Sequence, residues 1–149
     1  MDLEAVAEGL ATAASAIEGL RCFPYTPDSF AAPAFYVGEI TQTYDESFGR
    51  GMDSLTVICR VMVERTNERA AQKALNGYLS GSGPNSIKAA LEAASGAPGE
   101  SALPSDLAPD GCCDDFHVQR VAGHRLYTVG TTTYLGAEYT VLVIGPGES

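Results

Sequence analysis

The chain has 149 residues, a length that favours one domain able to bury its own core without a disulfide or a metal. It carries 19 acidic residues against 9 basic ones, for a net charge of −10. This balance argues against a nucleic-acid binder, whose affinity comes mainly from basic side chains, and against attachment to anionic membrane surfaces. The sequence has no apolar run of membrane-spanning length, and its acidic N-terminus lacks the basic region of a secretory signal. We therefore expect the protein in the cytosol where it is made.

The N-terminal segment predicts a helix. Apolar residues recur at spacings of three and four from Leu3 to Ile17, in one stripe rich in alanine, and Gly19 and Pro24 end the pattern. A narrow stripe of small residues predicts that this helix lies close against a sheet or another helix. The Pro-punctuated stretch after it leaves room for a short strand over Arg21–Tyr25.

Two strands are predicted next, over Ala34–Thr43 and Asp53–Glu64. The second alternates over eleven residues, which predicts a buried face and a face that carries Arg60, with the apolar Ile58 and Met62 also on that second face. Its buried face would hold Leu55, Val57, Cys59, Val61 and Val63. Between the strands, Tyr44–Met52 contains two aromatic residues and two glycines, so we expect a long hairpin tip rather than a tight turn.

Two helices are predicted in the middle of the chain. Asn67 can cap the first, over Glu68–Leu79, and Ser86 can cap the second, over Ile87–Ala94. The first helix would face inward with Ala70, Ala71, Ala74, Leu75, Tyr78 and Leu79. The segment that follows, Ser95–Gly111, is rich in Pro, Gly and Ser without an apolar period, and is predicted as a flexible loop.

The C-terminal part predicts strands over Asp115–Val121 and Tyr134–Ile144, and leaves room for one over Arg125–Val129. The apolar run at Val141–Ile144 suits a central strand covered on both faces. Strands grouped in runs with helices between them predict an α+β fold in a single domain. The sheet would be mixed and mostly antiparallel, covered by the N-terminal helix and the central helix pair.

No metal or cofactor site emerges from the sequence. His117 and His124 are the only histidines. Cys113 and His117 lie four apart, which on a strand separates them by about 13 Å, whereas ligands of one ion lie about 2 Å from it. Adjacent Cys112 and Cys113 lack the Cys-x2-Cys spacing that lets two thiolates converge. We expect all four cysteines, Cys22 and Cys59 included, to be free thiols in a reducing compartment.

No catalytic arrangement emerges either. Cys59 lies on an apolar strand face, where a free cysteine usually behaves as a small hydrophobe. Asp114 and Asp115 are adjacent, so on a strand they point to opposite faces. The chain contains no phosphate-binding glycine motif and no Gly-x-Ser-x-Gly turn. The sequence therefore predicts a protein that is not an enzyme.

What remains are features suited to assembly. The hairpin tip would leave Tyr44, Phe48 and Met52 near solvent, and aromatic residues, Met and Arg are enriched at interface cores. Alternatively, Phe48 folds back onto the domain's own core. The Ser95–Gly111 loop either orders on binding a partner or is a tolerated insertion.

Three blocks of sequence carry a family resemblance. They are Tyr44–Asp53 leading into Leu55–Val57, Ala71–Leu79 followed by Ser86–Glu92, and Tyr134–Val141. In their order and spacing they resemble the tail-terminator family of long-tailed bacteriophages, also called the tail-completion or head-to-tail joining family. The resemblance covers nearly the whole chain, and Ser95–Gly111 departs from it where a compact turn is expected.

The resemblance implies an α+β subunit that assembles as a homohexamer ring. Such a ring sits on the last ring of the major tail-tube protein, stops tube polymerisation and presents a surface to the head-completion or connector protein. DNA passes through the lumen without sequence-specific binding. The location implied is the host cytoplasm during assembly and the head–tail junction of the virion afterwards. The family brings no catalytic residue, metal, cofactor or membrane contact. Its hairpin-loop motif falls here on Tyr44, Asp45, Phe48, Arg50 and Gly51. We expect this loop to contact a neighbouring subunit or ring through Tyr44, Asp45, Phe48, Arg50 and Met52.

Two alternatives stay open. One is another neck protein, such as the head-side stopper. The other is a small cytosolic enzyme or ligand-binding domain that uses His117 or His124 near Cys113, which a convergent pocket holding those residues would favour. An acidic ring lumen would repel DNA, but on charge alone the simpler explanation, acidity that keeps a small protein soluble, is favoured.

Overall fold

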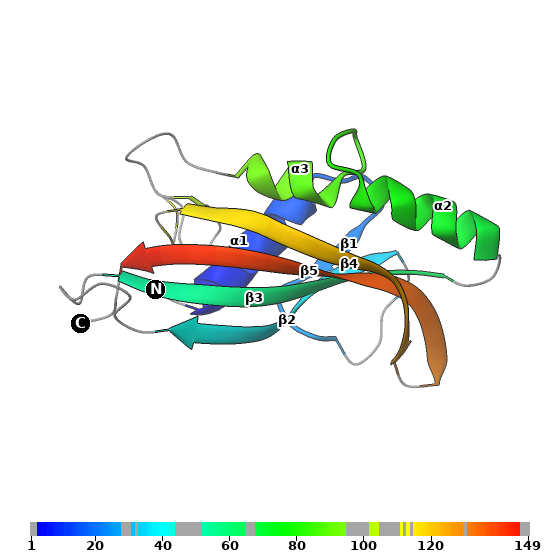
Figure 1. Ribbon diagram of the computed structural model, residues 1–149, viewed down its shortest axis with the longest axis horizontal. Coiled ribbons are helices and arrows are strands. Elements are labelled where there is room, and N and C mark those ends of the chain that lie inside the picture. Colours follow the sequence, from blue (N-terminus) through cyan, green and yellow to red (C-terminus); the bar gives the residue numbers. More distant parts are fainter. Residues whose placement is uncertain are drawn as a thin grey trace.

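Among the residues that the structure describes, five strands form one sheet, in the order β1-β2-β3-β5-β4, and three helices pack on it (Figure 1). The computed structural model describes residues 3–27, 31, 33–43, 52–64, 68–94, 102–104, 111, 113, 115–129 and 131–146. The helices are α1 (Leu3–Ala14), α2 (Glu68–Leu79) and α3 (Ile87–Glu92). The strands are β1 (Arg21–Phe23), β2 (Ala34–Thr43), β3 (Met52–Val63), β4 (Asp115–Val129) and β5 (Thr132–Pro146). The predicted α+β fold with a mixed, mostly antiparallel sheet is confirmed.

The register of the strands aligns their apolar residues on one face. β1 runs parallel to β2, and every other neighbouring pair is antiparallel. Cys59 of β3 lies between Val37 of β2 and Tyr139 of β5, and all three side chains are buried. Because side chains alternate along a strand, this register places a continuous apolar surface on one side of the sheet.

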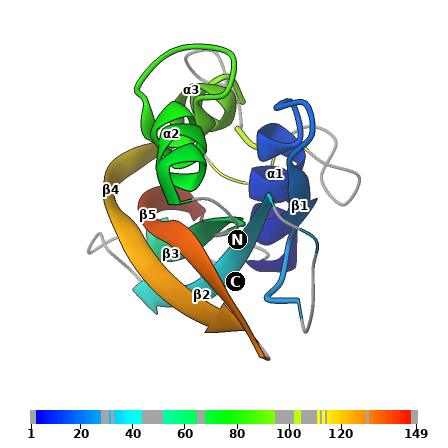
Figure 2. The ribbon, with the colours of Figure 1, turned by 90° about the vertical axis from the view of Figure 1, so that its right-hand side faces the viewer.

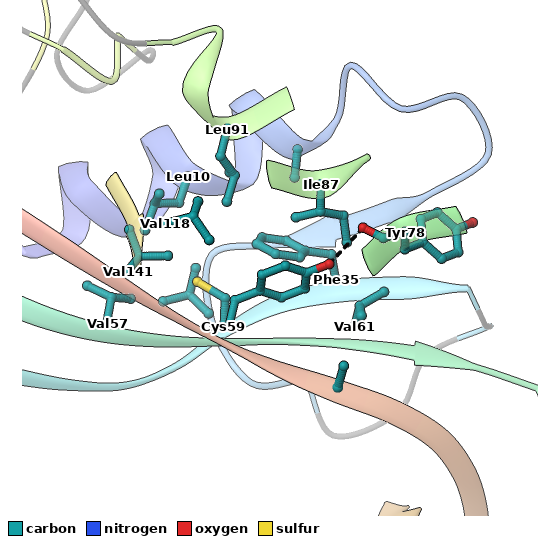
Figure 3. Packing of buried hydrophobic residues seen from close by; sticks show 14 of the residues in the cluster. Leu10, Phe35, Val57, Cys59, Val61, Tyr78, Ile87, Leu91, Val118 and Val141 are labelled. Atoms are coloured by element: carbon teal, nitrogen blue, oxygen red, sulfur yellow. Dashed lines mark hydrogen bonds between the residues drawn. The ribbon is translucent and has the colours of Figure 1, made fainter. Parts of the chain in front are cut away.

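The three helices cover that apolar face. The sheet curves around them, with α1 beside β1 and β2 and with α2 and α3 over β4 and β5 (Figure 2). Leu10 of α1 and Leu91 of α3 are fully buried and meet the sheet residues Val57 and Val141 (Figure 3). No helix among the described residues has the length and apolar character needed to cross a membrane.

A buried hydrogen bond ties α2 to the sheet. The hydroxyl of Tyr139 on β5 donates to the carbonyl oxygen of Tyr78, at 2.8 Å (Figure 3). Burial raises the pKa of Tyr139 well above its ordinary value, so the hydroxyl keeps its proton. This bond fixes the C-terminal turn of α2 over the central strands.

The buried side of α1 is wider than the predicted stripe. Gly9 is buried because Leu103 lies against it, and a Cβ at Gly9 would come within 2.9 Å of the Leu103 carbonyl oxygen. Leu103 and Ala102 are fully buried although both fall inside the predicted flexible loop. The amide of Leu103 donates to the carbonyl oxygen of Ala94 at 3.0 Å. Two isolated core residues leave no apolar period, so the sequence pattern did not indicate them.

The break expected between two C-terminal strands is absent. β4 runs unbroken over 15 residues, with irregular pairing between Val118 and Arg120 and between Ala122 and Arg125. A β-bulge takes up an extra residue without ending a strand, so the lost alternation there indicated a bulge and not a loop. The second bulge contains Gly123, where a Cβ would lie 2.6 Å from Leu79 of α2.

The prediction for α2 was partly wrong. Ala71, Leu75 and Tyr78 are buried as expected, but Ala70 and Ala74 are exposed. The covered stripe is therefore narrower than the alanine-rich pattern suggested, because alanine fits either environment. β5 is an inner strand, between β3 and β4, but the prediction that it is covered on both faces is wrong. Leu142 and Ile144 are only half-buried, because they lie on the face away from the helices.

Candidate assembly surface

The predicted interface loop joins two strands that pair as a hairpin. β2 and β3 pair antiparallel as far as Thr43 and Ser54, as expected for a hairpin connection. Met52 is the first residue of β3 and pairs with Pro146. The other predicted interface residues, Tyr44, Asp45, Phe48 and Arg50, lie outside the described residues. Their role at an interface stays a prediction.

The base of this hairpin is held by buried polar groups. Asp53 is only 2% exposed, on the helix-covered side with Leu55. The Nε2 atom of Gln42 donates to Asp53 Oδ2 at 3.3 Å across the strand pair. The loop therefore starts and ends on a fixed pair of strands.

The face of the sheet opposite the helices carries a row of charged side chains across four neighbouring strands. The row consists of Glu39, Arg60, Glu138 and Arg125, from β2, β3, β5 and β4; we call it the ionic row. Arg60 Nη2 donates to Glu39 Oε2 at 3.0 Å and to Glu138 Oε1 at 3.3 Å. Arg125 Nη1 lies 3.8 Å from Glu138 Oε2. The ionic row thus links β2 to β4 on the uncovered face.

The local sequence explains how Arg60 reaches both partners. A bulge in β2 falls at Gly38 and Glu39, and a Cβ at Gly38 would lie 2.7 Å from Arg60 Nη1. Burial opposes the charge of Arg60, but hydrogen bonding to Glu39 and the charges of Glu39 and Glu138 raise its pKa above the ordinary value. The pKa of Glu39 is lowered, first by a hydrogen bond to its own backbone and then by Arg60. Both side chains are therefore charged at neutral pH.

A hollow of about 340 Å³ lies beside the ionic row on the uncovered face. It is lined by Ile58, Arg120, Ala122, Arg125, Glu138 and Thr140. These residues offer two guanidinium groups, one carboxylate and one hydroxyl, around an apolar floor. Such a set can bind a complementary side chain by shape and charge. Among the described side chains that line the hollow, none is a thiol or an imidazole that could act as a nucleophile or a base.

The described structure does not bring together the residues of the enzyme alternative. Cys113 is 1% exposed, and its thiol donates to the Ala102 carbonyl oxygen at 3.8 Å. His117 is exposed and pairs in β4 with Leu142, on the opposite, uncovered face. The side chain of His124 lies outside the described residues, as does Cys112. Cys113 and His117 therefore do not form a nucleophile–base pair.

The remaining thiols are buried or half-buried. Cys59 is fully buried, and burial raises its pKa to about 12. Burial also raises the pKa of Cys22 to about 11. Among the described cysteines, Cys22, Cys59 and Cys113 form no disulfide. Thiols with pKa values as high as those of Cys22 and Cys59 are poor nucleophiles at neutral pH. Within the described ranges, no group of three or more His, Cys, Asp or Glu side chains could hold a metal ion.

The alternation in β3 predicts Arg60 on the polar side of its strand but gives it no role, and no sequence pattern singles out Glu39, Glu138 or Arg125. The available signal was one charged residue in the middle of each of two inner strands, Arg60 in β3 and Glu138 in β5. Comparison of the sequence with protein-family models, and separately with curated proteins, finds no match.

Proposed function

We propose that this chain is a structural assembly protein of a long-tailed bacteriophage, a tail terminator. In this proposal six copies form a ring that caps the tail tube and stops its polymerisation. The ring then joins the tail to the head connector and leaves a channel for DNA.

The observation that carries the proposal is the uncovered face of the sheet. A wide, half-exposed surface with an ionic row across four strands suits contact with other proteins, because polar groups that keep some exposure can bind without a large desolvation cost. The described residues on this face offer a charged hollow and not a convergent catalytic set.

The positions of the family-like blocks add support. The block that ends in Leu55–Val57 leads into β3, and the block Tyr134–Val141 lies in β5, the strand that pairs with β3. The middle block forms α2 and α3, which pack over the same sheet. The described parts of the three blocks therefore belong to the sheet and to the helices that pack on it.

Size-exclusion chromatography with light scattering, on the protein alone and with tail tubes from the same genome, tests the proposal. Capture on tube ends, with or without a free hexamer of about 94 kDa for six 15.6-kDa subunits, is the expected result. Binding to DNA-filled heads and not to tubes would support the head-side stopper instead. A monomer that binds neither would contradict both neck assignments.

The predicted loop contact has its own test. Arg50→Ala and Phe48→Ala should weaken capture on tube ends, because they remove a charged and an aromatic anchor from the loop. Arg69→Ala, which removes an exposed arginine of α2, is the matched control and should leave capture unchanged. Equal capture by all three variants would remove the loop from the proposed interface.

A further inference from the structure

β4 is the last strand at one end of the sheet, and its outer edge faces away from the other described strands (Figure 2). Within the described chain, residues 119–129 make no backbone hydrogen bond beyond their pairing with β5. Residues 125–129 pair with β5 without a shift of register. Such an edge can accept a further strand, because the amides and carbonyls of alternate residues point away from β5.

The exposed side chains along this edge differ between the two faces of the sheet. On the helix-covered side, Val121 and Leu126, whose partners on β5 are buried, are 36% and 58% exposed. On the uncovered side, Arg120 and Arg125 are exposed and line the hollow of about 340 Å³ beside the ionic row. Over residues 119–129 the edge is therefore apolar on one face and basic on the other.

Arg120 is the charge that the uncovered face leaves without a partner at the hollow. The ionic row joins two acidic and two basic side chains, so its own charges cancel, and Arg120 forms no ion pair within the described part of the chain. Asp115 of β4 is exposed on the same face, but it pairs with Ile144, whereas Arg120 pairs with Thr140. Four residues of β5 span about 13 Å, which is too far for an ion pair. One added carboxylate would therefore balance the charge at the hollow.

We propose that β4 binds an extended segment of a partner protein in which acidic and apolar side chains alternate. The segment adds as a strand along residues 125–129 and continues past the bulge toward Arg120. Because the side chains of an added strand alternate between the two faces, its carboxylates meet Arg120 and Arg125, while its apolar side chains meet Val121 and Leu126.

A protein segment fits this edge better than the backbone of a nucleic acid does. Ile58 and Ala122 line the hollow and suit the methylene groups of an acidic side chain. The local excess of one positive charge, on a chain of net charge −10, is too small to hold a polyanion. The inference rests on the proposed function for the source of the segment, a tail-tube or connector protein, but binding itself is tested with the purified chain.

NMR spectra of the isotope-labelled chain, titrated with a short capped peptide in which Val and Glu alternate, test the inference. The signals of residues 119–129 should shift on binding. Alternate amides of residues 125–129 should exchange more slowly with solvent, because an added strand accepts their hydrogen bonds. The same peptide with Lys in place of Glu should bind about tenfold more weakly, because like charges then meet.

Arg120→Glu with Arg125→Glu should reverse this preference, so that the Lys peptide binds about tenfold more tightly than the Glu peptide. A reversal cannot come from lost folding, because a misfolded chain would bind neither peptide at this edge. Arg69→Glu with Lys73→Glu changes the charge equally on exposed positions of α2, and this matched control should keep the preference of the parent chain. Leu126→Ser should weaken both peptides about fivefold, because it removes an apolar contact on the helix-covered side.

The proposed strand addition would be overturned by unchanged signals along residues 119–129 at about 1 mM peptide, or by equal binding of the two peptides. It would also be overturned if a single-stranded DNA oligonucleotide shifted the same signals at lower concentration than the Glu peptide. Failure of the proposed function gives a different pattern. In that case the Glu peptide would bind as expected, but the parent chain would not be captured on tail tubes.

Discussion

The two faces of this sheet are made by alternating residues of the same strands, yet they are held together by different forces. On the helix-covered face, Leu55, Val57 and Cys59 of β3 are fully buried. Their neighbours Thr56 and Ile58, on the other face, are only half-buried. Apolar burial stabilises the first face, whereas the ionic row spans the second. The contrast shows how one strand pattern can supply both a core and a surface available for contact.

The difference in burial between the two faces of the sheet is smallest where β4 and β5 approach their hairpin turn. Met62 and Tyr36 lie on the uncovered side but are buried. A Cβ at Gly136 would meet Met62 Sδ at 2.8 Å and the ring of Tyr127 at 2.9 Å. The uncovered face therefore contains a small packed cluster of its own beside the ionic row.

The largest expected effect compares the same substitution on the two faces. Leu55→Ala removes a fully buried side chain under the helices and should lower the free energy of unfolding by about 2–5 kcal/mol. Leu142→Ala, on the neighbouring strand and the uncovered face, should cost about 1 kcal/mol, because that side chain is already half-exposed. Urea unfolding measures both. Equal losses of stability would mean that Leu142 is as deeply buried as Leu55, so that its face of the sheet is not open to solvent.

A second substitution tests the packed cluster on the uncovered face. Gly136→Ala places a methyl group 2.6 Å from the carbonyl oxygen of Val61, which belongs to the strand paired with β5. We expect a loss of about 1–3 kcal/mol, because the strand pair must shift to admit it. Gly81→Ala is the control, since its Cβ would meet nothing within 4 Å. If the two variants unfold at the same urea concentration, Gly136 does not lie so close to the backbone of Val61.

Sequence patterns predicted the individual helices and strands better than they predicted how these elements pack against one another. The alternation in β3 correctly assigned Leu55 to the core and Arg60 to the other face, because a period of two residues is a local property. The ionic row could not be predicted, since it depends on the insertion of β5 between β3 and β4. The burial of Leu103 likewise depends on a distant glycine, Gly9, and leaves no local signal.

The stability of the fold should also fall at alkaline pH, because Cys59 is buried on the helix-covered face. Its pKa is about 12 in the fold against 9.0 for an unburied thiol, so between these values the unfolded chain loses a proton that the fold retains. Stability therefore falls as pH rises, by about 2 kcal/mol from this thiol between about pH 8 and pH 10.5. Tyr139, whose pKa is also raised by burial, adds to the fall at the upper end.

Cys59→Ala isolates the contribution of the Cys59 thiol to this loss of stability at alkaline pH. The cavity that it creates costs the same at both pH values, whereas the alkaline loss should shrink to the part contributed by the tyrosines. Urea unfolding of both proteins at the two pH values gives the comparison. An identical alkaline loss in the variant would show that Cys59 is not the buried group that titrates.

The smallest effects should come from the ionic row, which would confirm that the uncovered face contributes little to stability. Arg60→Gln should cost about 1 kcal/mol, because among the described residues it leaves the half-buried Glu138 with the more distant Arg125 as its ion-pair partner. Glu39→Gln should cost about 0.5 kcal/mol or less, since that side chain is 68% exposed. The pKa of Glu39 is lowered in the fold, so its contribution is present at neutral pH and is lost as the pH falls below the ordinary glutamate range.

Lys88→Gln is the reference for that series, because Lys88 pairs with Glu92 only one helical turn away on α3. Such a pair contributes about 0.3–0.5 kcal/mol and links no separate elements. Thermal unfolding at neutral pH, at low and at high salt, ranks the three variants. If Arg60→Gln costs no more than Lys88→Gln, the ionic row does not hold the four strands together. The charged side chains of the row would then be available for contacts with other molecules. In that case the helix-covered face alone would stabilise the fold, and the uncovered face would serve binding.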